Sequence, residues 1–145
     1  MKTIDVQLTQ NFKLSEFCTT SQNYEVFEMP YSYLLNIASL AMLLQKVRDV
    51  IKIPIRISSG YRPEALNTMV DGVKNSFHLV GAAADIYFDN RDDYDTAWKN
   101  FEYLFKYSAI YDIAELLGCP GSNWLHVSIN NAHRDIKHII NPNYY

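Results

Sequence analysis

The sequence predicts an α+β fold, a small antiparallel sheet with helices packed on one side. Two long stretches, 32–51 and about 90–107, carry apolar residues at three- and four-residue spacing, which indicates amphipathic helices. Four short segments have the character of strands: 53–58, 83–88, 110–117 and 124–129. Strands in short runs and helices that do not alternate strictly with them favour an α+β arrangement over a parallel βαβ one.

The length and composition indicate one globular domain over residues 1–145. Hydrophobic residues make up 48% of the 145 residues and charged residues 20%, and no repeat or linker interrupts them. With a formal charge of −3, the chain lacks the excess of basic residues that is typical of nucleic-acid-binding proteins. The apolar stretch 34–44 is too short to span a bilayer, so no membrane insertion is expected. We expect a monomer.

The first third of the chain supplies scaffold. Residues 1–13 alternate apolar and polar side chains, as in an edge strand, and Ser15 is placed to cap a short helical turn from Leu14 to Cys18. The polar run 19–30 ends in Pro30 and reads as a loop. The helix that follows, 32–51, is the clearest in the sequence.

The remaining elements follow in order. The strand 53–58 leads into the turn Ser59-Gly60-Tyr61-Arg62, and Pro63 suits the first turn of a short helix to Val70. Asp71-Gly72 signals a turn before the strand 83–88. Acidic residues crowd the start of the second long helix, where the helix dipole favours anions. A loop over 118–123 joins the last two strands, and a helix is predicted around 132–139.

Three residues have the character of metal ligands. His78 and Asp85 lie seven residues apart in a segment of otherwise apolar or small residues, where Gly81 allows close backbone approach. His126 shares one face of its strand with Trp124 and Ser128. Two imidazoles and one carboxylate around one Zn²⁺ leave a position for water, whose pKa falls towards about 7. The plainer interpretation is buried, hydrogen-bonded histidines and an aspartate that caps a turn.

The aromatic and cysteine content leaves further interpretations open. Eleven tyrosines and seven phenylalanines fit either core packing or a groove that lays aromatic rings along a peptide or glycan. Cys18 and Cys119 form no CxxC pattern, and we expect free thiols in a reducing cell.

Three blocks together resemble a known family. Ser58-Ser59-Gly60-Tyr61-Arg62-Pro63, then Ser76-x-His78-x-x-Gly81-x-Ala83-x-Asp85-Ile86, then Trp124-x-His126-x-Ser128 are similar to the zinc D-alanyl-D-alanine carboxypeptidases and the phage L-alanyl-D-glutamate endopeptidases. The resemblance covers about residues 11–130. It implies the hedgehog/DD-peptidase fold, one Zn²⁺ held by His78, Asp85 and His126, and the peptidoglycan stem peptide as the partner.

The resemblance also implies which residues act on the substrate. In this family the Arg of the Gly-Tyr-Arg turn, here Arg62, helps hold the scissile carbonyl or a substrate carboxylate, and its guanidinium suits either. Tyr61, in the same block as Arg62, is expected to contact substrate. Ser76 is suited to a hydrogen bond with the substrate or with a metal ligand, and a plain turn serine is the other interpretation. The family places an acidic residue three positions before the last His ligand, but this chain has Asn123, which cannot exchange a proton.

Glu115 is the nearest alternative proton acceptor. If the strands around the loop 118–123 pair antiparallel, Glu115 faces the metal from the neighbouring strand, whereas Asp112, three residues away, faces the other side. The related hedgehog domain has a similar Glu. The ordinary interpretation of Glu115 is a surface or salt-bridged residue.

The predicted function is therefore zinc-dependent hydrolysis of a peptide bond next to a D-amino acid in bacterial peptidoglycan. No signal peptide is evident, so we expect synthesis in the cytoplasm and access to the wall through lysis, a holin or a particle, as for a phage or prophage protein. Two rival hypotheses remain. One is a zinc-binding but non-catalytic wall-binding or virion protein, and the other is a structural protein without metal.

Overall fold

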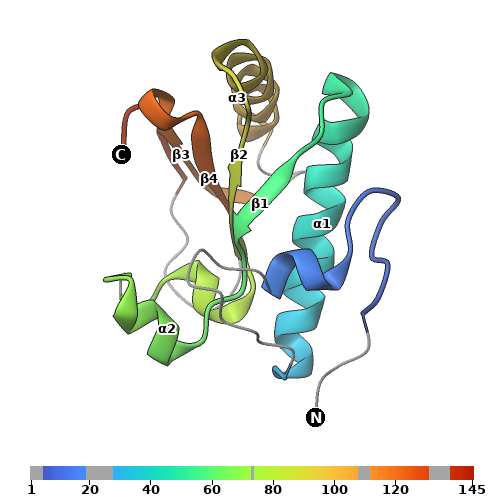
Figure 1. Ribbon diagram of the computed structural model, residues 1–145, viewed down its shortest axis with the longest axis vertical. Coiled ribbons are helices and arrows are strands. Elements are labelled where there is room, and N and C mark those ends of the chain that lie inside the picture. The colour runs from blue at the N-terminus through green and yellow to red at the C-terminus, as the bar shows by residue number, and fades with distance from the viewer. Residues whose placement is uncertain (1–4, 19–27, 73, 108–111, 131–137) are drawn as a thin grey trace.

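A computed structural model of the chain describes residues 5–18, 28–72, 74–107, 112–130 and 138–145. Its centre is a five-stranded sheet in the order β1-β2-β4-β3-β5 (Figure 1). The strands are β1 (Arg56–Ser59), β2 (Ala83–Tyr87), β3 (Ile113–Cys119), β4 (Trp124–Ile129) and β5 (Ile139–Asn141). Neighbouring strands pair antiparallel except β3 and β5, which are parallel. The predicted α+β fold with a mostly antiparallel sheet is confirmed.

The two long helices cover one face of this sheet. Helix α1 (Tyr31–Ile51) packs on β2 and β4, and α3 (Arg91–Phe105) packs on β3 and on α1 (Figure 1). Because side chains alternate along a strand, one face of each strand turns to the helices. Ala84, Ile86, Leu116, Leu125 and Val127 are all buried there. The opposite face is left for polar side chains.

Local signals explain where the long helices begin and end. Lys52 takes the left-handed conformation (φ 57°) and its N–H bonds to the Arg48 carbonyl, which ends α1 just before Pro54. Asn90 caps α3 by accepting a hydrogen bond from the Asp93 N–H at 2.9 Å. Both helices agree with the sequence prediction to within about two residues.

The shorter elements lie at the lower edge of the sheet in Figure 1. They are helix α2 (Glu64–Met69) and two 3-10 helices, η1 (Leu14–Cys18) and η2 (Phe77–Val80). A third 3-10 turn, η3 (Pro120–Ser122), joins β3 to β4. The helical turn predicted at 14–18 is confirmed, but Ser15 lies within it rather than capping it, and its hydroxyl donates to Asp5 Oδ2 at 2.7 Å. The helix predicted to begin at Pro63 is α2, with Pro63 at its N-cap.

Three predictions about the elements are wrong in part. No strand forms over the described residues 5–13, where Gln7 and Lys13 make one isolated bridge. Strand β1 begins at Arg56 rather than Ile53, since Pro54 cannot donate to a ladder. Residues 139–141 form β5 instead of ending a helix, while residues 131–137 of that predicted helix lie outside the described part.

Candidate metal centre

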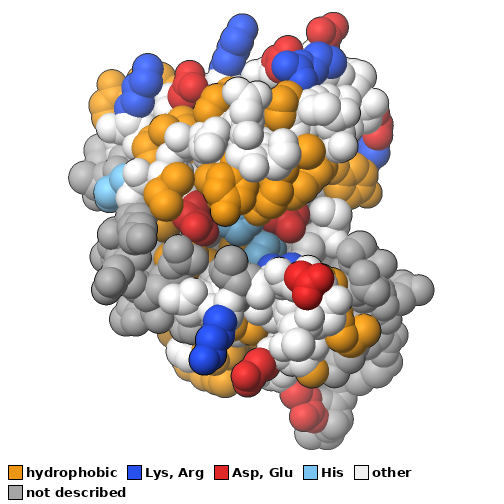
Figure 2. All heavy atoms as spheres, turned by 90° about the vertical axis from the view of Figure 1, so that its left-hand side faces the viewer, with side chains coloured by type: hydrophobic (Ala, Val, Ile, Leu, Met, Phe, Trp, Pro, Cys, Tyr) orange, Lys and Arg blue, Asp and Glu red, His pale blue; other side chains and the backbone are white. Residues whose placement is uncertain are grey.

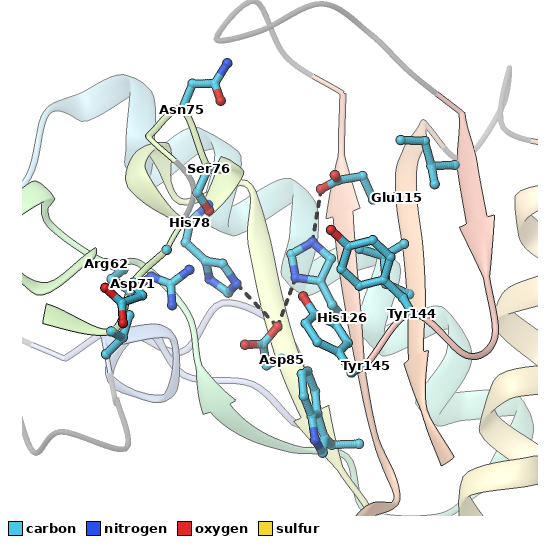
Figure 3. Close-up of a pocket in the computed structure, with 15 residues that line it drawn as sticks. Arg62, Asp71, Asn75, Ser76, His78, Asp85, Glu115, His126, Tyr144 and Tyr145 are labelled. Carbon is cyan, nitrogen blue, oxygen red and sulfur yellow. Dashed lines mark hydrogen bonds and ion pairs between the residues drawn. The ribbon is translucent and has the colours of Figure 1, made fainter. Parts of the chain in front are cut away.

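The predicted ligands converge on the polar face of the sheet. Asp85 of β2 and His126 of β4 are direct partners in the ladder, so their side chains leave the same face side by side. His78 comes from η2, immediately before β2. One ligand atom of each residue lies within 4.8 Å of the other two. His78 Nε2 is 3.3 Å and His126 Nδ1 is 2.9 Å from Asp85 Oδ1 (Figure 3).

The segment carrying His78 is shaped by Ser76 and Gly81. The Ser76 hydroxyl accepts a hydrogen bond from the His78 N–H at 3.1 Å and caps η2. Gly81 ends η2 with φ 74°, where a Cβ would lie 2.9 Å from both Ile37 Cγ1 and the Tyr33 carbonyl oxygen. The predicted close backbone approach at Gly81 is therefore confirmed, and it fixes the short turn between His78 and Asp85.

Each imidazole is oriented through its second nitrogen. His78 Nδ1 lies 2.7 Å from the Gly60 carbonyl oxygen, to which it donates, so Nε2 is the nitrogen that faces Asp85. His126 Nε2 lies 3.0 Å from Glu115 Oε1, and Ser128 donates to the same oxygen at 2.9 Å. Partners of this kind, a carbonyl for one histidine and a carboxylate for the other, are typical of metal-ligating histidines.

Burial and charge fit a site for a cation. His78 and His126 are buried, and Asp85 is largely so. Burial works to raise the pKa of Asp85, but the two imidazoles outweigh it and hold that pKa well below its usual value. Burial likewise opposes charge on His126, whereas Asp85 and Glu115 raise its pKa to about 9. With two nitrogens and a carboxylate, the donor set suits Zn²⁺, which in catalytic sites takes three protein ligands.

A cavity of about 460 Å³ opens over these residues. Figure 2 shows it as a hollow between two parts of the molecule, with histidine and acidic side chains at its floor. One wall comes from residues 62–72 and 75–78, which include α2 and η2. The other comes from β3, β4 and residues 139–145. Its described lining residues are Arg62, Val70, Asp71, Gly72, Asn75, Ser76, His78, Asp85, Glu115, Leu117, Trp124, His126, Ile139, Tyr144 and Tyr145.

The structure brings most of the predicted site residues into this cavity. Arg62 and Ser76 line one wall and Glu115 the other. Burial lowers the pKa of Arg62 while the charge of Asp85 opposes this. Within the described part of the chain, the buried Nε of Arg62 has no hydrogen-bond partner. Tyr61 is different: it is buried in the core, 5.8 Å from the ring of Tyr33, and does not line the cavity.

The strand pairing also explains Glu115 and the break at Asn123. Strands β3 and β4 are antiparallel and Glu115 pairs with Ser128, so Glu115 shares the face of His126, as the sequence predicts. Asp112 lies outside the cavity and accepts from the Asn130 amide. Asn123 takes the left-handed conformation (φ 54°) in the turn before β4, which suits an asparagine. Its side chain does not line the cavity.

Some lining residues gave no signal in the sequence. Asp71 takes a left-handed conformation (φ 54°) beside Gly72, and only its turn was predictable. Tyr144 and Tyr145 come from the end of the sequence, beyond the blocks that resemble the family. A high aromatic content was visible, but not which rings would reach the cavity.

Fold and site together define a metallohydrolase with a His-Asp-His centre on the open face of an α+β sheet. A family model described as peptidase M15 matches residues 10–128, most of the chain. The chain therefore belongs to the peptidase M15 family, whose members are zinc peptidases acting on peptidoglycan. A search of curated proteins finds no match. Among the described residues, no helix is long and apolar enough to cross a membrane.

Proposed function

We propose that the protein hydrolyses a peptide bond next to a D-amino acid in the peptidoglycan stem or cross-bridge. The observation that carries this proposal is the convergence of His78, Asp85 and His126 at the floor of an open cavity in an M15 chain. A zinc ion held there would act as a Lewis acid that activates water and polarises a carbonyl. The residues around it determine which substrate enters and where its protons go.

Arg62 is the proposed anchor for the scissile carbonyl or a substrate carboxylate. It lines the cavity on the same wall as His78, and its backbone N–H bonds to the His78 carbonyl at 2.9 Å. This bond ties the position of Arg62 to that of a metal ligand. A buried guanidinium N–H without a protein partner gains most from an acceptor on the substrate.

Glu115 is the proposed proton acceptor. Among the lining residues that the structure describes, three are acidic: Asp71, Asp85 and Glu115. Asp85 is taken as a ligand, and Asp71 lies on the opposite wall from Glu115 (Figure 3). Glu115 Oε1 contacts His126 Nε2 and Ser128, so the same carboxylate also orients His126. The two roles predict different effects when the carboxylate is replaced by an amide.

Digestion of purified peptidoglycan tests the proposal directly. The zinc-loaded protein is incubated with sacculi, and the muropeptides are analysed by mass spectrometry with and without a chelator. We expect new fragments that differ by hydrolysis of one bond beside a D-residue, absent with chelator and restored by added zinc. Unchanged muropeptides with a fully zinc-loaded protein would contradict the proposal.

A second candidate is a zinc-binding wall or virion protein without catalysis. Asn123 favours it, because the acidic residue that the resembling enzymes carry at this position is missing. That candidate predicts sedimentation with sacculi and no released fragments. The proposed association with a phage or prophage, and delivery by lysis, a holin or a particle, rest on the family resemblance and are tested by the genes that surround this one.

A further inference from the structure

Residues 139–145 form one side of the cavity, although they lie beyond the residues 10–128 that the family model matches. Strand β5 pairs in parallel with β3, placing Ile139 beside Glu115 and Asn141 beside Leu117. Four residues further on, the Tyr145 N–H donates to the Gly118 carbonyl oxygen at 3.1 Å. The segment is thus attached to the sheet at both of its ends.

Gly118 makes room for this attachment. A Cβ at Gly118 would lie 2.3 Å from the Pro142 carbonyl oxygen and 2.7 Å from Tyr94 Oη. The first of these is backbone, which cannot rotate out of the way. Any larger residue at position 118 therefore displaces the segment from the sheet. The absence of a side chain at Gly118 is what allows residues 139–145 to cross β3 so closely.

The attachment directs two tyrosines into the cavity. The Tyr145 ring packs against Trp124 with ring centroids 4.4 Å apart, and Tyr144 meets Tyr145 edge-on at 4.8 Å. Figure 3 shows the hydroxyl end of Tyr145 directed towards the side of the cavity that holds Asp85 and His126. Arg62 lies on the other wall. About half of the Tyr145 surface, 53%, remains exposed, so a bound molecule can reach it.

The Tyr145 hydroxyl is kept as a hydrogen-bond donor. The ordinary pKa of a tyrosine, about 10, lies well above neutral pH. The hydroxyl therefore stays protonated at neutral pH. A protonated phenol beside a centre where negative charge develops on a carbonyl oxygen can donate to that oxygen.

We propose that Tyr145 is a substrate-contacting residue whose hydroxyl donates a hydrogen bond to the scissile carbonyl from the wall opposite Arg62. Its ring, with Trp124, forms the surface on which the substrate backbone lies. This inference rests on the proposed function, since it names residues for that reaction. It assigns to residues 139–145 a part of the active site that the matched family region does not contain.

Tyr145→Phe tests the role of the hydroxyl, because it keeps the ring and removes one oxygen. The matched control is Tyr31→Phe, a 74% exposed tyrosine at the start of α1 and away from the cavity. With the soluble stem pentapeptide, we expect kcat/KM of Tyr145→Phe to fall by about a hundredfold to a thousandfold, as for other donors to a developing oxyanion. Zinc content and melting temperature should match the parent protein. Tyr145→Ala should weaken peptide binding as well, since the ring is lost.

Tryptophan fluorescence gives a measurement that does not depend on turnover. The chain has two tryptophans: Trp124 contacts Tyr145 at the cavity, whereas Trp98 is buried in α3. Stopped-flow mixing of the zinc-loaded protein with the pentapeptide should change the emission before hydrolysis. The change should disappear in Trp124→Phe and need more peptide in Tyr145→Ala.

The possible outcomes distinguish a failure of the Tyr145 assignment from a failure of the proposed function. If the parent protein cuts the peptide and Tyr145→Phe cuts it at an equal rate, the assignment of Tyr145 is wrong and the proposed function stands. If the parent neither cuts the peptide nor changes its emission, the proposed function fails, and the role of Tyr145 in it fails as well. A selective loss of kcat/KM in Tyr145→Phe, beside an unchanged Tyr31→Phe, supports the assignment.

Discussion

The two histidines of the metal centre are held in different ways. His78 is oriented by a backbone carbonyl, that of Gly60, and its helical turn is fixed by Ser76 and by the left-handed Gly81. His126 is oriented by a side chain, Glu115, which in turn is held by Ser128. The Gly60 carbonyl remains when side chains are substituted, whereas a single substitution at Glu115 removes the carboxylate partner of His126. The wall of β3, β4 and β5 is therefore the more adaptable side of the site.

The largest expected effect comes from the ligand that both sides share. Asp85 Oδ1 contacts both imidazoles, so Asp85→Asn removes the charge that balances the cation and disturbs both histidines. We expect bound zinc, measured by elemental analysis, to fall from one equivalent to near zero, and peptidoglycan hydrolysis to be lost. Asp71→Asn is the matched control, because Asp71 lines the same cavity outside the ligand group. Full zinc content in Asp85→Asn would refute this set of ligands.

Glu115→Gln sharpens the comparison at the adaptable side. If Glu115 accepts the proton, kcat should fall by about 10²- to 10⁴-fold while zinc stays bound. We expect this result from the proposed role. A fall of about 10- to 100-fold in zinc affinity, with activity rescued by excess zinc, would instead assign Glu115 to orienting His126 alone. Ser128→Ala is the control: it removes a contact to the same Glu115 oxygen and keeps the carboxylate.

Two glycine substitutions compare the walls directly. Gly81→Ala places a Cβ at positive φ against Ile37 and the Tyr33 carbonyl, and should cost about 1–3 kcal/mol in unfolding free energy and weaken zinc binding. Gly118→Ala displaces residues 139–145 and should weaken peptide binding while zinc remains. Denaturant unfolding and zinc titration of both variants measure these effects. Equal zinc affinities in the two variants would contradict the distinction between the walls.

The smallest expected effect is a dependence of stability on pH without metal. The pKa of His126 is raised to about 9, above its usual value, so its contribution to stability is complete below about pH 6.5 and is lost as the pH rises through about 9. The metal-free protein should therefore melt at a lower temperature at pH 9 than at pH 7. His126→Gln should reduce this difference. If the difference in melting temperature between pH 7 and pH 9 is unchanged in His126→Gln, other titrating groups cause it.

Much of the fold could be predicted because its signals are local. The 3.6-residue periodicity of 32–51 and the alternation of 124–129 gave α1 and β4 almost to the residue. The antiparallel pairing of β3 with β4, and so the face of Glu115, followed from a short loop and the period of a strand. The predicted ligands come together because Asp85 and His126 are direct partners in the ladder between β2 and β4.

What the sequence could not predict depends on contacts between distant residues. Strand β5 is three residues long and is formed through its pairing with β3, so it is too short to show the alternation of side chains that predicts a strand. Tyr61 sits within a matched block, but its ring turns into the core, a direction that the motif does not specify. The contact between His126 Nε2 and Glu115 forms only once β3 and β4 have paired in this register, which sequence spacing alone does not specify.

The anchoring of Tyr145 on Gly118 has a practical consequence for anyone who purifies this protein. Any peptide fused after residue 145 starts at the rim of the cavity. A polyhistidine tag placed there would bring competing imidazoles next to the metal ligands and could take the zinc or block the entrance. The zinc content of a form tagged after residue 145, compared with that of the untagged protein, would reveal this artefact.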